Sequence, residues 1–275
     1  MEVKELPAKV LTTIGIGSSY PVFFPKDVSE LKSLLKNEKV FVIGGGSNTV
    51  LPPKIESKLV SLKHFKKVEF REDSILLGAG VLLREIIKLQ IKKGFSLFEF
   101  LAGVPKATVG GLVAQNAGAF GKEIKERLLE VIFLDLETFE IVSLKDFENF
   151  SYRSSPFPEK GIILEAKFKI TRNKKVKEEI KRFIFTRLSK QPPFFVRTSG
   201  STFKNPKGFS AGKLLDMAGF KGFKVGKVKF SEFHANFCIN EGGSFEDFKT
   251  LVELAKKKVK EKFNVNLDLE VKIPS

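Results

Sequence analysis

Residues 40–48 read VFVIGGGSN, and in this stretch a short apolar run leads directly into three consecutive glycines. The run at 40–43 is typical of a buried strand, because a strand covered on both faces needs no polar side chains. In the loop that follows, successive backbone N–H groups with no side chains in the way would suit a pyrophosphate, helped by the Ser47 hydroxyl. A flexible turn explains GGGSN alone equally well.

A second segment of small side chains lies further along the chain. Residues 101–121, LAGVPKATVGGLVAQNAGAFG, hold five glycines and five alanines in 21 positions. Another group can approach such a backbone closely, either a flat cofactor or a tightly packed protein segment. Two glycine-rich segments in successive domains favour one shared cofactor that carries phosphate over two unrelated turns.

The flanking sequence predicts an α+β protein of three domains. Pro52-Pro53 breaks the chain near the first boundary. We expect the domains to cover residues 1–56, 57–172 and 173–266, with residues 267–275 returning to the first.

Local patterns predict the elements of each domain. Asp27, Asn173 and Ser244 are suited to cap helices, and Gly94 and Gly219 are suited to end them. The expected helices cover 28 to about Asn37, 82–93, 174–189, 210–218 and a long stretch from 244; the expected strands cover 74–77, 131–136, 140–144, 162–170 and 267–273, and a loop is expected at 198–208.

The composition is that of a folded protein with anionic partners. Of its 275 residues 42% are apolar and 29% charged, and the formal net charge is +16. The single cysteine, Cys238, excludes an internal disulfide. No apolar run is long enough to span a membrane, and residues 1–10 carry charges where a signal peptide is apolar, so we expect a cytoplasmic protein.

Most catalytic signatures are absent from the sequence. It contains no G-x-x-x-x-G-K-[ST], H-E-x-x-H, C-x-x-C, G-x-S-x-G or G-x-G-x-x-G. With two histidines and one cysteine, a zinc site would need carboxylate ligands, and we expect no metal.

Seven motifs, in order, resemble those of the UDP-N-acetylenolpyruvoylglucosamine reductase (MurB) family across nearly the whole chain. The combination of GSTFKNP with YRxSxF is highly specific, whereas GGGSN alone also suits other flavoproteins of the same fold. The motifs are GGGSN (44–48), VGG…QNAGAFG (109–121), YRSSPF (152–157), SGSTFKNP (199–206), AGKLLDMAGFKG (211–222), FHANFCIN (233–240) and LDLEV (267–271).

The resemblance implies an FAD-binding fold of the vanillyl-alcohol-oxidase/MurB kind, with two α+β FAD-binding domains and a C-terminal α+β substrate domain. No long insertion precedes SGSTFKNP, so the chain is similar to the shorter MurB type, which lacks an extra substrate-covering loop. Two departures could shift local FAD contacts. Residues 14–17, IGIG, stand where the family often has a Gly-Gly pair, and Lys106 stands where Gly or Ser is common.

The implied reaction is the NADPH-driven reduction of UDP-N-acetylglucosamine enolpyruvate to UDP-N-acetylmuramate through FAD, in the synthesis of peptidoglycan precursors. Hydride addition at C3 of the enolpyruvyl group pushes charge toward a carboxylate, so cations must face it. Arg153 is the matching arginine, suited to clamp a carboxylate. Ser201 is the matching proton donor to C2 and needs a positive neighbour such as Lys204. Glu270 matches an acid that orients Arg153 or, with a raised pKa, donates a hydrogen bond to the enolate.

The remaining matched residues would bind the two ligands. Those matched to FAD binding are Gly44, Gly45, Gly46, Ser47, Asn48, Thr49, Thr108, Gly110, Gly111, Asn116 and Gly118; those matched to substrate binding are Tyr152, Lys204, Asn205, His234 and Asn236.

Each candidate also has a plain structural interpretation. Ser201 would bond its own backbone, as isolated loop serines usually do. Glu270 lies opposite the apolar residues of an alternating segment and would be a surface carboxylate. Arg153 would be one of many solvated basic residues, and His234 and Asn236 a satisfied polar pair in a strand.

Two other functions compete with the implied one. A different FAD oxidoreductase of the same fold, such as an alcohol oxidase, would give no reason for Arg153, Ser201 and Glu270 together. The net charge suits a nucleic-acid-binding protein, but lysines and acids alternate along the chain and no RRM, KH or helix-turn-helix signature is present. We therefore expect a monomer with two anionic small-molecule ligands, no nucleic acid and no membrane insertion.

Overall fold

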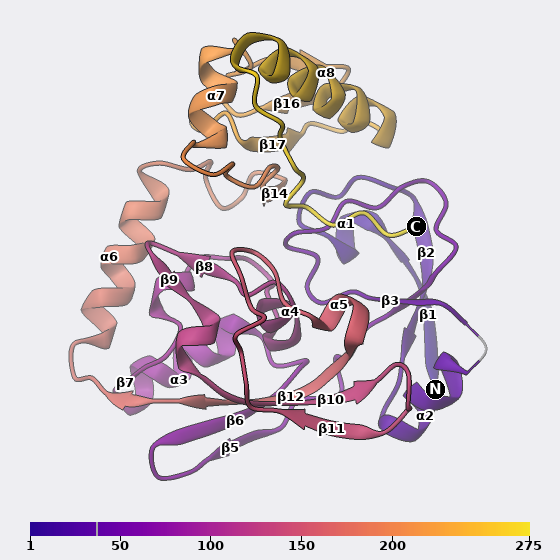
Figure 1. Ribbon diagram of the computed structural model, residues 1–275, viewed down its shortest axis with the longest axis vertical. Coiled ribbons are helices and arrows are strands. Elements are labelled where there is room, and N and C mark those ends of the chain that lie inside the picture. The colour runs from indigo at the N-terminus through magenta and orange to yellow at the C-terminus, as the bar shows by residue number, and fades with distance from the viewer. Residues whose placement is uncertain (37) are drawn as a thin grey trace. The chain divides into compact units, whose positions relative to one another are not determined.

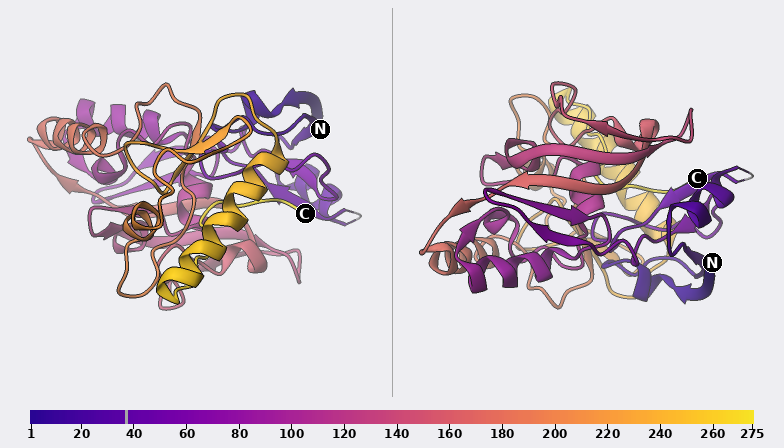
Figure 2. Two further views of the ribbon diagram at one scale, coloured as in Figure 1. Left: turned by 90° about the horizontal axis from the view of Figure 1, so that it is seen from above. Right: turned by 90° about the horizontal axis from the view of Figure 1, so that it is seen from below.

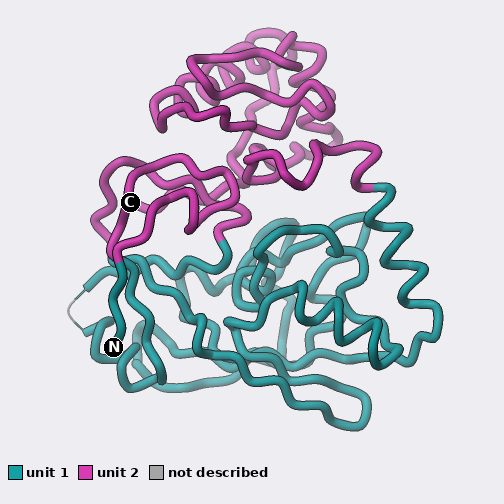
Figure 3. Tube along the Cα trace, turned by 180° about the vertical axis from the view of Figure 1, so that it is seen from behind, with its two compact units in different colours: residues 1–4, 22–45, 58–186 teal, residues 5–21, 46–57, 187–275 magenta. Residues whose placement is uncertain are grey.

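A computed structural model describes residues 1–36 and 38–275 (Figure 1). The chain forms two compact units, drawn in two colours in Figure 3: unit 1 comprises residues 1–4, 22–45 and 58–186, and unit 2 comprises residues 5–21, 46–57 and 187–275. The chain passes from one unit to the other inside the glycine loop, between Gly45 and Gly46. The finer division into three domains, with boundaries after 56 and 172, stays a prediction.

The glycine loop follows the edge strand of a four-stranded sheet. The strand order is β1 (Glu2–Pro7), β2 (Ser19–Phe24), β4 (Lys58–Val60) and β3 (Val40–Val42), and β4 is parallel to both β2 and β3. Of the apolar run at 40–43 only Ile43 is buried, and Val42 is 36% exposed. The predicted strand is present, but its predicted burial is wrong, because β3 lies at the edge of the sheet and has a neighbouring strand on one side only.

Helix α2 (Val28–Leu35) begins at the predicted cap. The Asp27 side chain accepts a hydrogen bond of 2.9 Å from the Glu30 N–H, and Glu30 in turn accepts one of 2.9 Å from the Lys26 N–H. The predicted helix end near Asn37 lies outside the described residues.

A five-stranded antiparallel sheet forms one face of unit 1, which the view from below in Figure 2 shows. The predicted hairpin is confirmed, with Leu134 opposite Ile141 and the Asp135 carboxylate accepting the Glu137 and Thr138 N–H groups at 2.9 Å each. The strand order is β11 (Ile141–Leu144), β10 (Leu128–Asp135), β12 (Gly161–Lys169), β6 (Ser74–Gly78) and β5 (Val68–Phe70).

Helices and short elements surround this sheet. The core of unit 1 includes Phe98, Phe133, Phe157 and Phe168, and the rings of Phe133 and Phe157 meet edge to face at 5.1 Å. The predicted stop of α3 is confirmed, since Gly94 has a φ of 68°. The elements are α3 (Leu83–Lys93), β7 (Phe95–Ser96), η1 (Glu99–Leu101), α4 (Val109–Ala114), β8 (Gly118–Ala119), β9 (Lys122–Glu123), η2 (Ile124–Arg127), α5 (Phe157–Lys160), β13 (Thr171–Arg172) and α6 (Val176–Leu188).

Unit 2 combines a second antiparallel sheet with three helices. Helix α8 (Phe245–Phe263) buries Phe248, Leu251 and Val259 in the core of this unit. The strand order is β14 (Thr198–Ser201), β17 (Phe237–Asn240), β16 (Val228–Phe230) and β15 (Lys224–Val225); the other helices are α1 (Ala8–Leu11) and α7 (Ala211–Met217).

Two predicted elements of unit 2 are wrong in part. The expected loop at 198–208 begins as strand β14, because residues 198–201 pair with β17. The expected strand at 267–273 is not continuous. Leu269 forms a single bridge with Phe203 and Lys272 forms one with Thr49, so the segment changes partners before a ladder can form.

Neither a membrane span nor a metal cluster was found in the described part of the chain. Among residues 1–36 and 38–275, no helix has the length and apolarity needed to cross a bilayer. The same residues contain no group of three or more His, Cys, Asp and Glu side chains placed to hold a metal ion.

We expect Ser244→Ala to lower the free energy of unfolding by about 1 kcal/mol, because it removes the cap of α8. Ser244 Oγ accepts the Asp247 N–H at 3.1 Å, and the Asp247 carboxylate accepts the Ser244 N–H at 2.8 Å, which holds the pKa of Asp247 below its usual range. Urea unfolding followed by far-ultraviolet circular dichroism measures the loss. Thr250→Ala, an exposed change within the same helix, is the matched control; equal stabilities of the two variants would contradict the prediction.

Candidate functional site

The two glycine-rich segments of the sequence meet in unit 1. A Cβ atom on Gly45 would overlap the carbonyl oxygen of Lys106, and one on Gly44 would lie 2.5 Å from Thr108 Oγ1. No side chain fits at position 45, and one at position 44 would have to displace the Thr108 hydroxyl, so the backbone of the loop lies directly against residues 106–108. The inference that both segments serve one ligand gains support from this contact.

Lys106 takes a backbone conformation that favours glycine. Its φ is 55°, in the left-handed region where a side chain is strained. Glycine adopts this conformation without strain, and it is one of the two residues, Gly and Ser, that the resemblance leads us to expect at this position. Here a lysine occupies the same backbone shape.

The second segment begins helix α4. Thr108 caps this helix by accepting the Gly111 N–H at 3.4 Å. Gly110 lacks a side chain for packing reasons, because a Cβ there would lie 3.0 Å from the Ala79 Cβ. Gly111 is exposed, and a Cβ on it would meet nothing closer than the Thr108 hydroxyl at 3.4 Å, so its backbone is open to a ligand.

The backbone of the glycine loop has donors to offer. Within the described residues, the N–H groups of Gly44, Gly45 and Gly46 donate no hydrogen bond to another protein group. Three such donors in a side-chain-free loop fit the phosphates of a dinucleotide. The residues present therefore fit FAD.

The end of the loop belongs to unit 2. Gly46 has a φ of 64° and packs on the Leu11 carbonyl, and its own carbonyl accepts the Thr13 N–H at 3.0 Å. Ser47 is half-buried, whereas Thr49 is buried. The Asn48 amide donates to the Glu270 carbonyl at 2.9 Å, so this predicted cofactor residue also holds the C-terminal segment.

Asn116 uses its side chain inside the protein. It is fully buried, its amide donates to Glu123 Oε2 and to the Ser151 carbonyl at 2.9 Å each, and its oxygen accepts the Lys125 N–H at 3.2 Å. We therefore expect Asn116 to position the neighbouring loops around a cofactor through these bonds.

Arg153 lies at the tip of a tight turn. Ser151 and Ser154 exchange two backbone hydrogen bonds of 3.1 Å, and Ser155 Oγ anchors the turn by donating to the Ala114 carbonyl at 2.7 Å. Arg153 itself has a φ of 55°. The motif YRSSPF thus builds a strained turn that is fixed at its base.

The guanidinium of Arg153 contacts strand β8 and the ring of the neighbouring Tyr152. Nη2 donates to the Gly118 carbonyl at 2.6 Å, and the guanidinium carbon lies 5.1 Å from the centre of the Tyr152 ring. A Cβ on Gly118 would lie 3.0 Å from Arg153 Nη1, so Gly118 makes room for the arginine. Tyr152 is 44% exposed and can contact a ligand.

Ser201 ends strand β14 beside a bulge. The register between β14 and β17 shifts between Thr198 and Ser201, and Gly200 has a φ of 77°. Bulges of this kind redirect the next side chain. In the described part of the chain the half-buried Ser201 hydroxyl makes no hydrogen bond, so it is available to a substrate.

The C-terminal segment brings Glu270 next to the SGSTFKNP motif. The Glu270 N–H donates to the Thr202 carbonyl at 2.9 Å, and the Lys204 N–H donates to the Asp268 carbonyl at 2.9 Å. Glu270 is half-buried, which differs from the surface position that its alternation suggests. Two backbone hydrogen bonds thus lay the segment of Glu270 alongside the SGSTFKNP motif, which contains Ser201 and Lys204, within unit 2.

Lys272 is a charged neighbour that the sequence analysis missed. Burial lowers its pKa, repulsion from Lys204 lowers it further, and Glu270 opposes both effects. Two lysines with one carboxylate leave a positive charge that suits an anionic ligand. The signal was present in the sequence, because Lys272 follows Glu270 by two positions and so shares its face of an extended segment.

Two predicted substrate residues, Asn205 and Asn236, make hydrogen bonds through their side chains within unit 2. Asn205 Oδ1 accepts the Ala211 N–H at 3.0 Å at the start of α7. The buried Asn236 clasps Phe203, accepting its N–H at 2.9 Å and donating to its carbonyl at 2.8 Å. Asn236 lies in the loop before β17 rather than in a strand. From there its side chain holds the main chain just after β14, the strand that ends at Ser201.

His234 packs against the first turn of α7. A Cβ on Gly212 would lie 2.8 Å from its ring, and its Nδ1 accepts the Asn236 N–H at 3.2 Å. Burial lowers the pKa of His234. The imidazole is consequently neutral at pH 7 and serves as a hydrogen-bonding group rather than as a cation.

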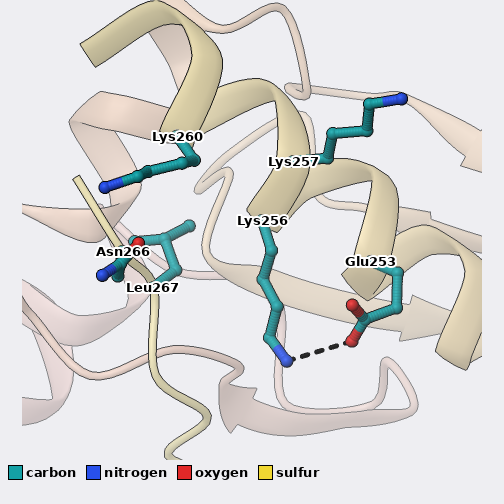
Figure 4. Close-up of a pocket in the computed structure, with 6 residues that line it drawn as sticks. All are labelled: Glu253, Lys256, Lys257, Lys260, Asn266 and Leu267. Carbon is teal, nitrogen blue, oxygen red and sulfur yellow. Dashed lines mark hydrogen bonds and ion pairs between the residues drawn. The ribbon is translucent and has the colours of Figure 1, made fainter. Parts of the chain in front are cut away.

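A pocket on the surface of α8 contains none of these residues. It is lined by side chains of the helix and of the segment that follows it, and Lys256 pairs there with Glu253 at 3.0 Å (Figure 4). The chemistry of the described residues points to the glycine loop and the SGSTFKNP motif instead. The lining residues are Glu253, Lys256, Lys257, Lys260, Asn266 and Leu267.

Comparisons with known proteins agree with this picture. Residues 191–274 match the family model of the UDP-N-acetylenolpyruvoylglucosamine reductase C-terminal domain, and residues 21–144 match that of an FAD binding domain. The UDP-N-acetylenolpyruvoylglucosamine reductase of Aquifex aeolicus is 40% identical over 98% of this chain and 94% of its own length. That of Rickettsia conorii is 35% identical over the same shares.

A solved structure extends the likeness to the fold. The UDP-N-acetylenolpyruvylglucosamine reductase (MurB) from Thermus caldophilus superposes with a TM-score of 0.86 and 29% identity, covering 100% of both chains. The predicted FAD-binding fold with a C-terminal α+β domain is confirmed, and the protein is an FAD-dependent oxidoreductase. From its motifs, its domains and these relatives, the chain belongs to the UDP-N-acetylenolpyruvoylglucosamine reductase (MurB) family.

Proposed function

We propose that this protein reduces UDP-N-acetylglucosamine enolpyruvate to UDP-N-acetylmuramate, with NADPH as the hydride donor, as a step in peptidoglycan precursor synthesis. The observation that carries the proposal is the pairing of the Ser201 segment with the Glu270 segment, through the 2.9 Å hydrogen bond from the Glu270 N–H to the Thr202 carbonyl. This pairing joins the segments that carry a hydroxyl and a carboxyl group, the kinds of group that can deliver a proton.

Residues of the two glycine-rich segments would hold FAD. The backbone N–H groups of Gly44–Gly46 would face its phosphates, the exposed Gly111 would leave room beside them, and Thr108 and Asn116 would shape the surrounding loops. FAD, when bound, supplies the transfer of a hydride from NADPH to C3 of the enolpyruvyl group.

Arg153 would bind the carboxylate of the enolpyruvyl group. As C3 gains a hydride, the electron pair of the alkene moves toward C2 and the carboxylate, and a fixed guanidinium stabilises that charge. The bond from Nη2 to the Gly118 carbonyl and the contact with the Tyr152 ring keep the guanidinium in one orientation.

Ser201 would donate the proton that C2 needs to complete the reduction. Its oxygen then regains a proton from solvent, so that one hydride and one proton have been added across the double bond. Lys204 and Lys272 supply positive charge in the same unit, which stabilises an alkoxide. Glu270 would orient Arg153 or donate a hydrogen bond to the developing enolate; both roles suit a half-buried carboxyl group.

The remaining proposals concern setting and partners. We propose that the protein works as a cytoplasmic monomer and that its net charge of +16 serves two anionic ligands, NADPH and the sugar nucleotide. A different FAD oxidoreductase reaction would not use Arg153, Ser201 and Glu270 as a set.

Anaerobic visible absorption of the purified protein tests the function directly. We expect NADPH to bleach the flavin spectrum and UDP-N-acetylglucosamine enolpyruvate to restore it. Bleaching without recovery would reject the substrate and retain the flavoprotein. A protein that shows no flavin spectrum after addition of FAD would reject both.

We expect Ser201→Ala to leave bleaching by NADPH intact and to slow recovery with the sugar nucleotide by roughly 10²- to 10⁴-fold, the usual contribution of a positioned proton donor. Stopped-flow absorption separates the two steps. Ser199→Ala, a change two positions earlier in the same strand, controls for effects on β14. Equal slowing of bleaching and recovery would reject the proton-donor role.

We expect Arg153→Ala to weaken binding of the enolpyruvyl substrate by roughly 10- to 100-fold, because charge-assisted hydrogen bonds contribute about 1.5–3 kcal/mol each. Recovery of the flavin spectrum should slow as well, since the guanidinium faces charge that grows during the reaction. Titration of the oxidised holoenzyme with substrate measures the binding. A variant impaired only in its affinity for NADPH would show that Arg153 does not bind the enolpyruvyl carboxylate.

A further inference from the structure

Unit 1 buries a carboxylate that the proposed reaction does not use. Glu99, the first residue of η1, is 3% exposed. Its Oε2 accepts the Leu97 N–H at 2.8 Å and the amide of the fully buried Gln90 at 3.0 Å. A buried charge is expensive unless it is both hydrogen-bonded and paired, so its partner is informative.

The partner of Glu99 is Lys122. Glu99 Oε1 lies 3.8 Å from Lys122 Nζ, and the lysine side chain is 44% exposed. Lys122 belongs to β9, so the ion pair ties the buried η1 to a strand of the short β8–β9 hairpin. The lysine chain also reaches α6, where Nζ lies 5.8 Å from the centre of the Phe183 ring.

The β8–β9 hairpin is the element that holds Arg153. Gly118 in β8 accepts the 2.6 Å hydrogen bond from Arg153 Nη2, and Ala119 pairs with Lys122 across the hairpin. A Cβ on Gly118 would lie 2.5 Å from the Lys122 carbonyl and 3.0 Å from Arg153 Nη1. The two strands and the guanidinium therefore pack closely against one another. A shift of Lys122 would move the Gly118 carbonyl, which accepts the hydrogen bond from Arg153.

We propose that Glu99 and Lys122 are positioning residues for Arg153: the buried carboxylate fixes β9 through its ion pair, and the hairpin then fixes the guanidinium that receives the substrate carboxylate. The inference rests on the proposed function for the identity of that carboxylate. Arg153 needs such support because its backbone is strained, with a φ of 55°, and its side chain is only half-buried. Placement errors near 1 Å at a reacting group cost on the order of 100-fold in rate.

Glu99→Gln breaks this connection without disturbing its buried end. The glutamine oxygen can still accept the Leu97 and Gln90 hydrogen bonds, whereas its amide faces the Lys122 ammonium with donors only. Lys122→Met removes the positive charge of the ion pair at a partly exposed position, and Lys122→Arg retains that charge. Glu130→Gln is the matched control, because Glu130 pairs with Lys145 at the same 3.8 Å elsewhere in unit 1.

A double-mutant cycle with Arg153→Ala tests the proposal on the FAD-loaded protein. We expect Glu99→Gln and Lys122→Met each to weaken substrate binding to the oxidised protein and to slow recovery of the flavin spectrum about tenfold. The rate of bleaching by NADPH should change less than about twofold in each variant. Lys122→Arg, which keeps the positive charge, should show wild-type substrate binding and recovery. In the Arg153→Ala background, adding Glu99→Gln should weaken binding and slow recovery by less than about a further twofold. Calorimetric titration with substrate measures the binding independently of turnover.

Three results would overturn the proposal. The first is wild-type substrate binding and recovery in both Glu99→Gln and Lys122→Met. The second is a Glu99→Gln effect that is as large in the Arg153→Ala background as in the wild-type protein. An equal loss in Glu130→Gln would show a general charge effect instead. If the wild-type protein fails to recover its flavin spectrum with the sugar nucleotide, the proposed function itself is rejected. The wild-type protein alone gives that result, so the two failures are distinguishable.

Discussion

The contact between Gly45 and the carbonyl of Lys106 is the constraint on which the cofactor region depends. Because a Cβ atom would overlap that oxygen, the loop after β3 and the segment before α4 can lie together only if position 45 is glycine. The contact leaves backbone N–H groups of the loop without protein partners, which is the condition for binding phosphate. Lys106 accepts a left-handed backbone so that its carbonyl can point at the loop. Close packing against Lys106 and the binding of phosphate thus both require the glycine loop to lack side chains.

Backbone hydrogen bonds, more than side-chain contacts, assemble the chemical groups of unit 2. Asn236 clasps the main chain of Phe203, Thr202 accepts the Glu270 N–H, and Asn48 donates to the Glu270 carbonyl. The resemblance assigns Asn48 and Asn236 to ligand binding, yet both side chains form hydrogen bonds with the main chain of the protein. Their apparent functional role includes scaffolding, which a motif alone cannot distinguish from direct contact.

Local signals in the sequence predicted local structure well. The caps at Asp27 and Ser244, the stops at Gly94 and Gly219, and the hairpin around residues 137–139 depend on neighbours within a few positions, and all are present. The exposure of β3, the strand at 198–201 and the broken pairing of 267–273 depend on which distant segments lie beside them, and a single sequence does not contain that information. Motif resemblance named Arg153, Ser201 and Glu270, but it passed over Lys272, whose spacing from Glu270 was readable in the sequence, and Glu99, whose burial only the fold reveals.

The clasp of Asn236 on Phe203 also has an evolutionary consequence. Since both hydrogen bonds go to the main chain of residue 203, a lineage can exchange the phenylalanine for another apolar residue and keep the clasp. Position 236 has no such freedom: aspartate cannot donate to the carbonyl, and a longer glutamine displaces the strand. Substitution should therefore be tolerated at position 203, two residues after Ser201, and resisted at position 236, whose side chain acts through hydrogen bonds to the protein's own main chain.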